Sequence, residues 1–324
     1  MPVKKVELHV HLEGTISPAL AKTLAARNQC VIPEGLIAAD GESYLSRDFL
    51  HFLGVYDTLA DLIKVPQDYY DVTFDYLRSN ARDDVLYVEM NYSPDHAEKG
   101  SGIPSQEHLH AIQQAIDDAE SSFGIIGRIQ IIAVRQFGPE ASIRMANEAV
   151  KNILPCVTGF GLGGDELGFP PKLFQKAYQI ASGAGLLCTA HAGEFAPASG
   201  ILEALTYLPL RRIGHGVQAI HSPEVMDVIK TRGIALELCP SSNIKFGLFP
   251  DMNAHPLPRF LDAGISISIN SDDPPFVHTT VSKEYARVQQ AYKYTDEQMN
   301  GITSMAIDAA FVDDETKARL HARL

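Results

Sequence analysis

Histidines and carboxylates recur along the chain at spacings that suit a bound metal ion. His9 and His11 stand two residues apart in the apolar run "VELHVHL". In a β-strand, residues i and i+2 point to the same side, so these two imidazoles project together. Three later strings supply further groups of this kind: "TAHAGE" with His191 and Glu194, "RIGHGV" with His215, and "INSDDPPF" with Asp272 and Asp273. Together they indicate a polar cluster that can hold a cation.

A divalent cation would relieve the repulsion within this cluster. Without a cation between them, adjacent carboxylates such as Asp272 and Asp273 repel each other, or one of them has a raised pKa. Imidazole and carboxylate ligands together suit Zn²⁺, which keeps an open position for water in catalytic sites. We therefore expect one zinc ion per subunit, with the ligands His9, His11, His191 and Asp272.

The remaining groups of the cluster suit proton transfer. A zinc ion lowers the pKa of water and makes hydroxide available near neutral pH. His215 can take up and return the proton of that water, and Glu194 can act as the acid opposite it if desolvation keeps its carboxyl protonated. Asp273 is then free to orient the hydroxide or to accept a hydrogen bond from a substrate.

These residues need a scaffold that brings the ends of several strands together. Short apolar runs, several rich in β-branched residues and bounded by Gly, Pro or Asp, alternate with longer amphipathic segments. The runs that we interpret as strands cover residues 6–12, 85–92, 126–134, 157–164, 186–193, 212–217, 234–240 and 265–271. Eight strands that alternate with helices predict a (β/α)8 TIM barrel, in which polar residues after each strand face one mouth.

The rival α/β architecture is a doubly wound open sheet. Its usual phosphate-binding turn is missing, because no GxGxxG string follows the first run. Residues 17–84 are long for one barrel crossover, so we expect additional helices there that form a lid over the C-terminal mouth. The sequence shows no linker, low-complexity tract or internal repeat, so we expect residues 1–324 to form a single domain.

The charge balance argues against two classes of partner. The 324 residues include 27 Lys and Arg against 40 Asp and Glu, which gives a net charge of −13. A phosphate backbone or an anionic membrane favours a basic protein face, so we expect neither nucleic acid nor membrane as a partner. No stretch approaches the ~20 apolar residues of a membrane helix, and charged residues interrupt any signal-peptide core. We expect a cytoplasmic protein that acts on a small molecule.

Six strings, in this order, resemble the motifs of the adenosine deaminase family: "VELHVHLEG", "GLGGDE", "AHAGE", "RIGHGV", "CPSSN" and "NSDDPPF". They extend over residues 6–276. The resemblance implies a (β/α)8 barrel with one zinc ion and the hydrolytic deamination of an aminopurine in purine salvage. It implies the four zinc ligands already named, with Glu194 as the proton donor to a ring nitrogen and His215 as the base near the hydroxide.

The resemblance also implies residues that contact the purine. It assigns contacts with purine ring nitrogens to Gly164 and Asp273. Members of the family have an apolar gate on a helix after the first strand, and "DFLHFL" at 48–53 is similar to it. Phe49 is therefore a candidate for covering the base, although a core position on an amphipathic helix would explain it equally well.

Glu13 bears on the choice between two branches of the family. Nucleoside deaminases typically carry Asp here and use it on a ribose hydroxyl, whereas adenine deaminases typically carry Glu, whose longer side chain could fill the ribose space. Yet "GLGGDE" at 161–166 resembles the nucleoside branch. We expect Glu13 to contact the substrate, and we expect adenosine, with 2'-deoxyadenosine, to be converted into inosine and ammonia. Adenine, which would give hypoxanthine, and a modified adenine compound are the alternatives.

Three other classes fit the sequence less well. Zinc deaminases of nucleic-acid bases carry a PCxxC string, and "CPSS" at 239–242 lacks its second cysteine. Two-metal amidohydrolases usually need a lysine after the fourth strand, and "GLGGDELG" has none, so a metal count would decide. A binding protein on a degenerate enzyme scaffold would have lost Glu194, a histidine ligand or Asp272, and all of these are present.

Overall fold

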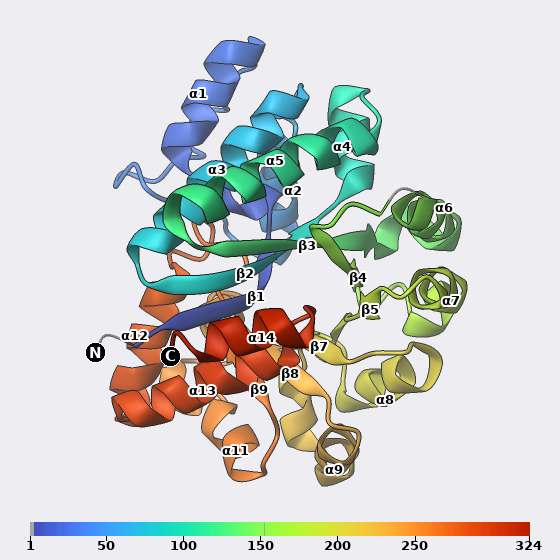
Figure 1. Cartoon of the computed structure of the whole chain (residues 1–324), viewed down its shortest axis with the longest axis vertical. Coiled ribbons are helices and arrows are strands. Elements are labelled where there is room, and N and C mark those ends of the chain that lie inside the picture. The colour runs from blue at the N-terminus through green and yellow to red at the C-terminus, as the bar shows by residue number, and fades with distance from the viewer. Residues whose placement is uncertain (1–2, 152) are drawn as a thin grey trace.

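The computed structural model describes residues 3–151 and 153–324 and forms an α/β barrel (Figure 1). Its strands, in chain order, are β1 (Lys5–His11), β2 (Val85–Tyr92), β3 (Ile126–Val134), β4 (Val157–Gly163), β5 (Leu187–Cys188), β6 (His191–Ala192), β7 (Arg212–His215), β8 (Ala235–Leu238) and β9 (Ile267–Ile269). They pair in parallel in the orders β1-β2-β3-β4-β5 and β6-β7-β8-β9.

Two further contacts join these two rows of strands. β5 and β6 are two pieces of one strand position, and between them Thr189 donates its amide to the carbonyl of Phe160 on β4 at 3.1 Å. On the other side, Val10 on β1 forms a parallel bridge with Asp272, which follows β9. Within the described residues, each of the eight predicted runs therefore contributes to the barrel, as the sequence pattern predicts.

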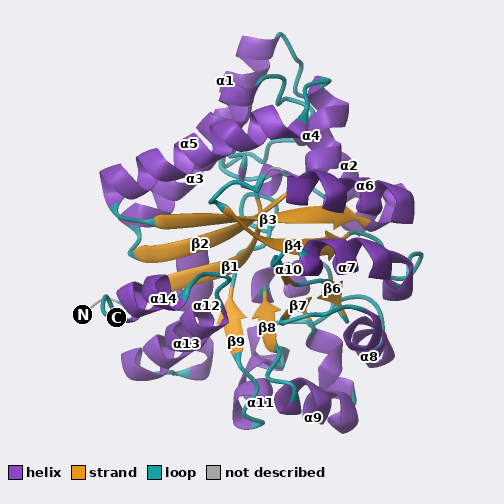
Figure 2. Cartoon of the chain, turned by 45° about the vertical axis from the view of Figure 1, so that its right-hand side comes forward, coloured by secondary structure: helices purple, strands orange, loops and turns teal. Residues whose placement is uncertain are grey.

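Helices surround the strands on the outside (Figures 1 and 2). They are α1 (Pro18–Asn28), α2 (Phe49–Ala60), α3 (Pro66–Arg82), α4 (Pro94–Ser101), α5 (Ser105–Phe123), α6 (Gly138–Lys151), α7 (Gln175–Gly183), α8 (Ala198–Tyr207), α9 (Pro223–Thr231), α10 (Pro240–Lys245), α11 (Leu257–Asp262), α12 (Val281–Tyr292), α13 (Asp296–Ala309) and α14 (Asp314–His321). Among the described residues, no helix is long and apolar enough to cross a membrane.

The segment 17–84 contains three helices with different neighbours. Helix α1 begins where Ser17 accepts a hydrogen bond from the amide of Leu20, and a proline follows Ser17 at the first helical position. Helix α2 packs against η1 (Glu13–Thr15), the turn that follows β1. Helix α3 packs against α5 and β2, as an ordinary outer helix of the barrel does. Only part of the segment therefore lies over the mouth.

The core explains why the strands read as nearly continuous apolar runs. Every residue of β2 is buried, which is typical of parallel strands that are covered on both faces. One apolar cluster extends from Leu24 on α1 and Phe52 on α2 to Ile229 on α9. Packing thus holds the helices above the mouth against the same core as the barrel, and it sets the position of the side chains that face the mouth.

Candidate active site

Four predicted metal ligands converge where the strands end at the barrel mouth. They are His9 and His11 on β1, His191 on β6, and Asp272 just after β9. Their ligand atoms all lie within 4.8 Å of one another. Nε2 of His11 is 3.3 Å from Nε2 of His191, and Oδ1 of Asp272 is 3.4 Å from Nε2 of His9. Such separations suit one tetrahedral ion, because two ligand atoms about 2.1 Å from a zinc ion lie about 3.4 Å apart.

Hydrogen bonds on the outer nitrogens orient two of these imidazoles. Nδ1 of His9 donates to Oε2 of Glu237 at 2.7 Å. Nδ1 of His191 donates to the carbonyl of Leu162 at 3.0 Å. Because these oxygens only accept, each ring carries a proton on Nδ1 and can turn a lone pair on Nε2 toward the cluster centre. Nε2 of His9 is buried and has no hydrogen-bond partner among the described residues, so the donor set fits a cation.

The charges around His9 favour a cation as well. Burial opposes a charge on this imidazole, yet Asp272 and Glu237 outweigh burial and raise the pKa of His9 to about 10. Burial also opposes the ionisation of Asp272, but His215 and His9 hold the pKa of Asp272 well below its ordinary value. A metal ion would supply the positive charge that these buried carboxylates attract.

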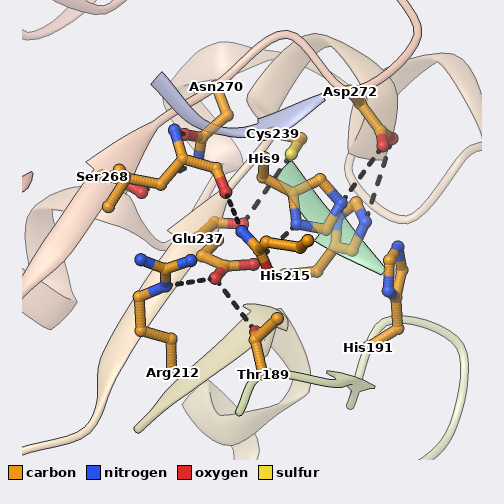
Figure 3. Close-up of polar contacts among 12 residues, drawn as sticks. His9, Thr189, His191, Arg212, His215, Glu237, Cys239, Ser268, Asn270 and Asp272 are labelled. Carbon is orange, nitrogen blue, oxygen red and sulfur yellow. Dashed lines mark hydrogen bonds and ion pairs between the residues drawn. The ribbon is translucent and has the colours of Figure 1, made fainter. Parts of the chain in front are cut away.

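Glu237 on β8 orients His9, and the sequence interpretation did not single it out. Besides His9, it accepts hydrogen bonds from Nε of Arg212 at 2.6 Å and from Oγ1 of Thr189 at 2.9 Å (Figure 3). Burial disfavours its charge, but Arg212 and His9 lower the pKa of Glu237 to about 2. Glu237 could have been found from the sequence, because it is a carboxylate inside the apolar run "IALELCP" and a buried charge needs a partner.

Glu194 and His215 face the same centre as the metal ligands. Nε2 of His215 lies 3.7 Å from Oε2 of Glu194 and 3.8 Å from Oδ2 of Asp272. These distances are too long for direct hydrogen bonds. Burial, reinforced by Asp272 and Glu166, raises the pKa of Glu194 well above its ordinary value. Burial therefore favours the protonated form of this carboxyl beside the candidate metal site.

Glu166, from the string "GLGGDE", supports the loop that carries Glu194. Its Oε2 accepts hydrogen bonds from the backbone amides of Glu194, Phe195 and Ala196 at 3.2, 3.1 and 2.8 Å. The side chain of Glu166 is also buried. The sequence interpretation used the string for resemblance but gave Glu166 no role.

Left-handed backbone conformations cluster at this site. His215 has φ 58° and Asp272 has φ 63°, values that non-glycine residues rarely adopt. Gly164, after β4, has φ 95°, and a Cβ there would lie 2.1 Å from Oε1 of Gln136. Strain of this kind often accumulates at functional sites, and here it turns side chains at strand ends into the mouth.

A cavity of about 110 Å³ opens beside the cluster. The predicted site residues on its wall are His11, Phe49, Gly164, His191, Glu194, His215, Asp272 and Asp273. The ring of Phe49, the first residue of α2, lies 4.6 Å from that of Phe195 and 5.3 Å from that of Phe246, centroid to centroid. Phe49 and Phe246 line the cavity and make part of its wall apolar.

Asp273 contributes an unpaired carboxyl to the cavity wall. Its Oδ1 is buried and has no hydrogen-bond partner within the described part of the chain. Burial, with Asp272 beside it, raises the pKa of Asp273 well above its ordinary value. Gly14 leaves room for this carboxyl, because a Cβ on Gly14 would lie 1.9 Å from Oδ1 of Asp273. A protonated carboxyl in this position can donate a hydrogen bond to a ligand.

Comparison with known proteins agrees with this geometry. Residues 4–324 match the model of the family described as "Adenosine deaminase". The chain belongs to the adenosine deaminase family. Its relatives include an adenine deaminase of Chelativorans sp. (strain BNC1), 40% identical over 320 residues that cover 99% of this chain and 97% of the relative. An adenine deaminase of Rhizobium johnstonii is 40% identical over 322 residues, 99% of each chain.

Solved structures extend the comparison. The adenine deaminase of Arthrobacter aurescens superposes with a TM-score of 0.91 at 27% identity and covers 100% of this chain and 98% of its own. An amidohydrolase of Burkholderia ambifaria with bound Zn superposes with a TM-score of 0.89 at 29% identity, over 99% and 89% of the two chains. The predicted barrel and family are confirmed, and the chain is a hydrolytic deaminase that acts on C–N bonds.

The deaminase places Glu13 behind the cavity wall, although we predicted a contact with substrate. Its side chain is 1% exposed and does not line the cavity. Oη of Tyr69 donates to Oε1 of Glu13 at 2.9 Å, and Oη of Tyr56 donates to Oε2 at 3.1 Å. The amide of Ser93 approaches Oε1 at 3.4 Å. Tyr56 and Ser93 line the cavity in its place.

Proposed function

We propose that this deaminase converts adenine and water into hypoxanthine and ammonia, in purine salvage, with one zinc ion per chain. The curated relatives with identities up to 40% are named adenine deaminases. These names favour adenine, the alternative substrate given above, over adenosine, the substrate that we expect from the sequence. The string "GLGGDE" led us to expect adenosine, whereas the names of the relatives favour adenine.

The main observation in support of this proposal is that both carboxylate oxygens of Glu13 are already hydrogen-bonded within the protein. Its two carboxylate oxygens accept hydrogen bonds from Tyr56 and Tyr69, so neither is turned to a ribose hydroxyl in the cavity. The ring of Tyr56 stands on the wall where Glu13 would otherwise reach the ligand. The cavity has a volume of about 110 Å³, and a free base needs less space than a nucleoside does.

Zn²⁺ is the metal that we propose for the cluster of His9, His11, His191 and Asp272. Three imidazoles with one carboxylate are typical ligands of zinc, and the amidohydrolase of Burkholderia ambifaria contains Zn. When bound, the ion supplies Lewis acidity and makes hydroxide available near neutral pH. The chain's own groups do the rest of the chemistry.

Glu194 is the proton donor in this proposal. Because burial raises the pKa of its carboxyl and favours the protonated form, it can give a proton to the ring nitrogen next to the carbon that bears the amine. That carbon becomes more electrophilic, and the oxygen of water attacks it. One proton of the water passes to the amine, which leaves as ammonia when the C–N bond breaks, and the other proton restores the carboxyl of Glu194. Nε2 of His215 lies 3.8 Å from Oδ2 of Asp272, so in this proposal it stands next to the attacking oxygen.

Other residues hold the base in place. Burial favours a protonated carboxyl on Asp273, which can donate to a second ring nitrogen, and the backbone of Gly164, also on the cavity wall, contacts the ring. Phe49 covers the ring with its aromatic face and keeps water away from the reacting carbon. Together these contacts orient the amine-bearing carbon toward the polar cluster.

The test is a comparison of substrates by loss of the aminopurine absorbance with zinc-loaded protein. We expect kcat/KM for adenine to exceed that for adenosine and 2'-deoxyadenosine by a factor of about 100 or more. Glu13→Asp shortens the side chain and frees space, so it should raise the ratio of kcat/KM for adenosine to kcat/KM for adenine by a factor of about 10. Glu224→Asp, the same change at the exposed start of α9, is the control. Faster turnover of adenosine by the native protein would overturn the proposal.

A further inference from the structure

Two buried residues behind His215 have no role in the chemistry above. Asn243, from the string "CPSSN", lies on α10, and His255 follows η5 (Met252–Ala254). Nδ2 of Asn243 lies 3.1 Å from Nδ1 of His215, and Oδ1 of Asn243 lies 3.2 Å from Nε2 of His255. Nδ1 of His255 lies 3.3 Å from the backbone amide of Leu257. A continuous chain of hydrogen bonds therefore runs from the start of α11 to His215.

The backbone amide at one end of this series of hydrogen bonds determines which group donates in each of them. The amide of Leu257 can only donate, so Nδ1 of His255 must accept. Burial lowers the pKa of His255 to about 3, so its imidazole is neutral and its single proton lies on Nε2. That proton is donated to Oδ1 of Asn243, which turns Nδ2 of the amide toward His215.

The hydrogen bond from Asn243 also determines which nitrogen of His215 carries its proton. Since Nδ2 of Asn243 donates, Nδ1 of His215 accepts, and a neutral His215 carries its proton on Nε2. In the reversed arrangement, Oδ1 of Asn243 would face His215 and Nδ2 would donate to Nε2 of His255, so the proton of His255 would lie on Nδ1. The N–H group at Nδ1 would then face the backbone N–H group of Leu257 at 3.3 Å. A buried clash between donors of this kind is costly.

We infer that Asn243 and His255 are positioning residues that hold His215 as the tautomer with its proton on Nε2. Nε2 is the atom that faces Oε2 of Glu194 at 3.7 Å and Oδ2 of Asp272 at 3.8 Å. His215 therefore enters the reaction as a hydrogen-bond donor to the oxygen that attacks. It cannot accept a proton at Nε2 before it has released the one it holds. This inference rests on the proposed function for the place of His215 in the reaction.

The proton position can be measured directly on the native, zinc-loaded protein. Long-range ¹H–¹⁵N correlation spectra of protein labelled with ¹⁵N-histidine distinguish the two neutral tautomers. The signals of His215 and His255 are assigned by their loss in His215→Gln and His255→Gln. We expect both rings to show the pattern of a proton on Nε2. A proton on Nδ1 of His215 would overturn the inference. This readout needs no turnover, so it stands apart from a failure to deaminate adenine.

Asn243→Asp then tests whether the network matters for catalysis. A carboxylate has nearly the same shape as the amide but only accepts, so it should move the proton of His215 to Nδ1 and still accept from His255. We expect kcat for adenine to fall about 100-fold, with KM changed less than about threefold and zinc content unchanged, as when an orienting partner fixes the wrong tautomer. A moved proton with native kcat would overturn the inference, and so would a loss of kcat that merely follows lost zinc.

Two changes at His255 separate positioning from packing. His255→Gln keeps an N–H group that can donate to Asn243, whereas His255→Leu keeps the volume without a donor. We expect the Gln variant to retain kcat within about fivefold and the Leu variant to lose about as much as Asn243→Asp. Equal losses in the two variants would mean that His255 acts through packing alone, which would contradict its assignment.

Discussion

At the scale of single residues, the surroundings shift the pKa values of two buried glutamates in opposite directions. Glu237 lies against Arg212 and His9, which lower its pKa to about 2. Glu194 is equally buried, but its charged neighbours include Asp272 and Glu166, and its pKa is raised well above the ordinary value. One carboxylate can therefore orient a ligand while the other keeps a proton to give.

Glu194→Gln keeps the shape of the side chain but removes the proton that it can transfer. We expect kcat for adenine to fall about 10³-fold, because general acid catalysis contributes about 10²–10⁴. KM and zinc content should change little, since Gln can still occupy the same space. Steady-state kinetics with metal analysis measures both quantities, and Glu224→Gln at an exposed position is the control. Retention of more than about a tenth of native kcat would remove Glu194 from this role.

At the scale of elements, Glu7 joins β1, α3 and the segment after β9. Its Oε2 accepts from Oη of Tyr76 on α3, and its Oε1 accepts from the amide of Ser271 at 2.8 Å and from the Ser271 hydroxyl. Ser271 directly precedes Asp272, so this contact ties an outer helix to the position of a predicted metal ligand. Burial raises the pKa of Glu7 to about 7, against the hydrogen bonds from Ser271 and Tyr76.

This contact predicts a dependence of stability on pH. Below the unfolded pKa of 4.5, Glu7 is protonated in both states. Between pH 4.5 and 7 the unfolded chain loses this proton while the folded chain keeps it, so the free energy of unfolding falls by about 3 kcal/mol. Above the folded pKa both states are ionised, and the contribution becomes constant.

Glu7→Gln should abolish this contribution, because glutamine does not titrate. Urea unfolding of native and variant protein at a fixed excess of zinc, from pH 4.5 to 8, measures the difference between the two. The difference in the free energy of unfolding between the two proteins should change by about 3 kcal/mol between pH 4.5 and 7 and then stay constant. Other titrations cancel in the difference, so parallel curves would show that the pKa of Glu7 is the same in the folded and unfolded states.

At the scale of the whole molecule, the candidate metal site spans the seam of the barrel. His9 and His11 belong to the first strand, His191 to the strand position that joins the two rows, and Asp272 bridges to Val10 on β1. A bound ion would hold these parts together in the folded state, whereas the unfolded chain has no such site. The free energy of metal binding would then add to the stability of the fold.

Removal of the metal should therefore affect both activity and stability. A chelator should abolish turnover and lower the melting temperature by about 5–10 °C, since saturation at 1,000 times Kd contributes about 4 kcal/mol. Added zinc should restore both. Scanning fluorimetry with elemental analysis measures the change and should find one zinc per chain. Two ions per chain would favour a two-metal amidohydrolase, and an unchanged melting temperature would contradict the structural role.

Local patterns in the sequence determined much of this protein. The period of two places His9 and His11 on one side of β1, and turn residues mark where strands end, so the mouth and most of its polar groups could be predicted. The reason is that strand direction and strand ends depend on neighbours in the chain. Glu237 was also accessible in principle, as a charge inside an apolar run.

Only the tertiary structure decided which distant groups meet. The bond between Glu237 and His9 joins residues 228 apart, and the bond between Asn243 and His215 joins the end of one strand to a helix after the next. Tyr56 and Tyr69 turn Glu13 away from the cavity, which no local pattern records. These contacts depend on strand register and on helix packing across the barrel, and both are set by the core as a whole rather than by neighbouring residues.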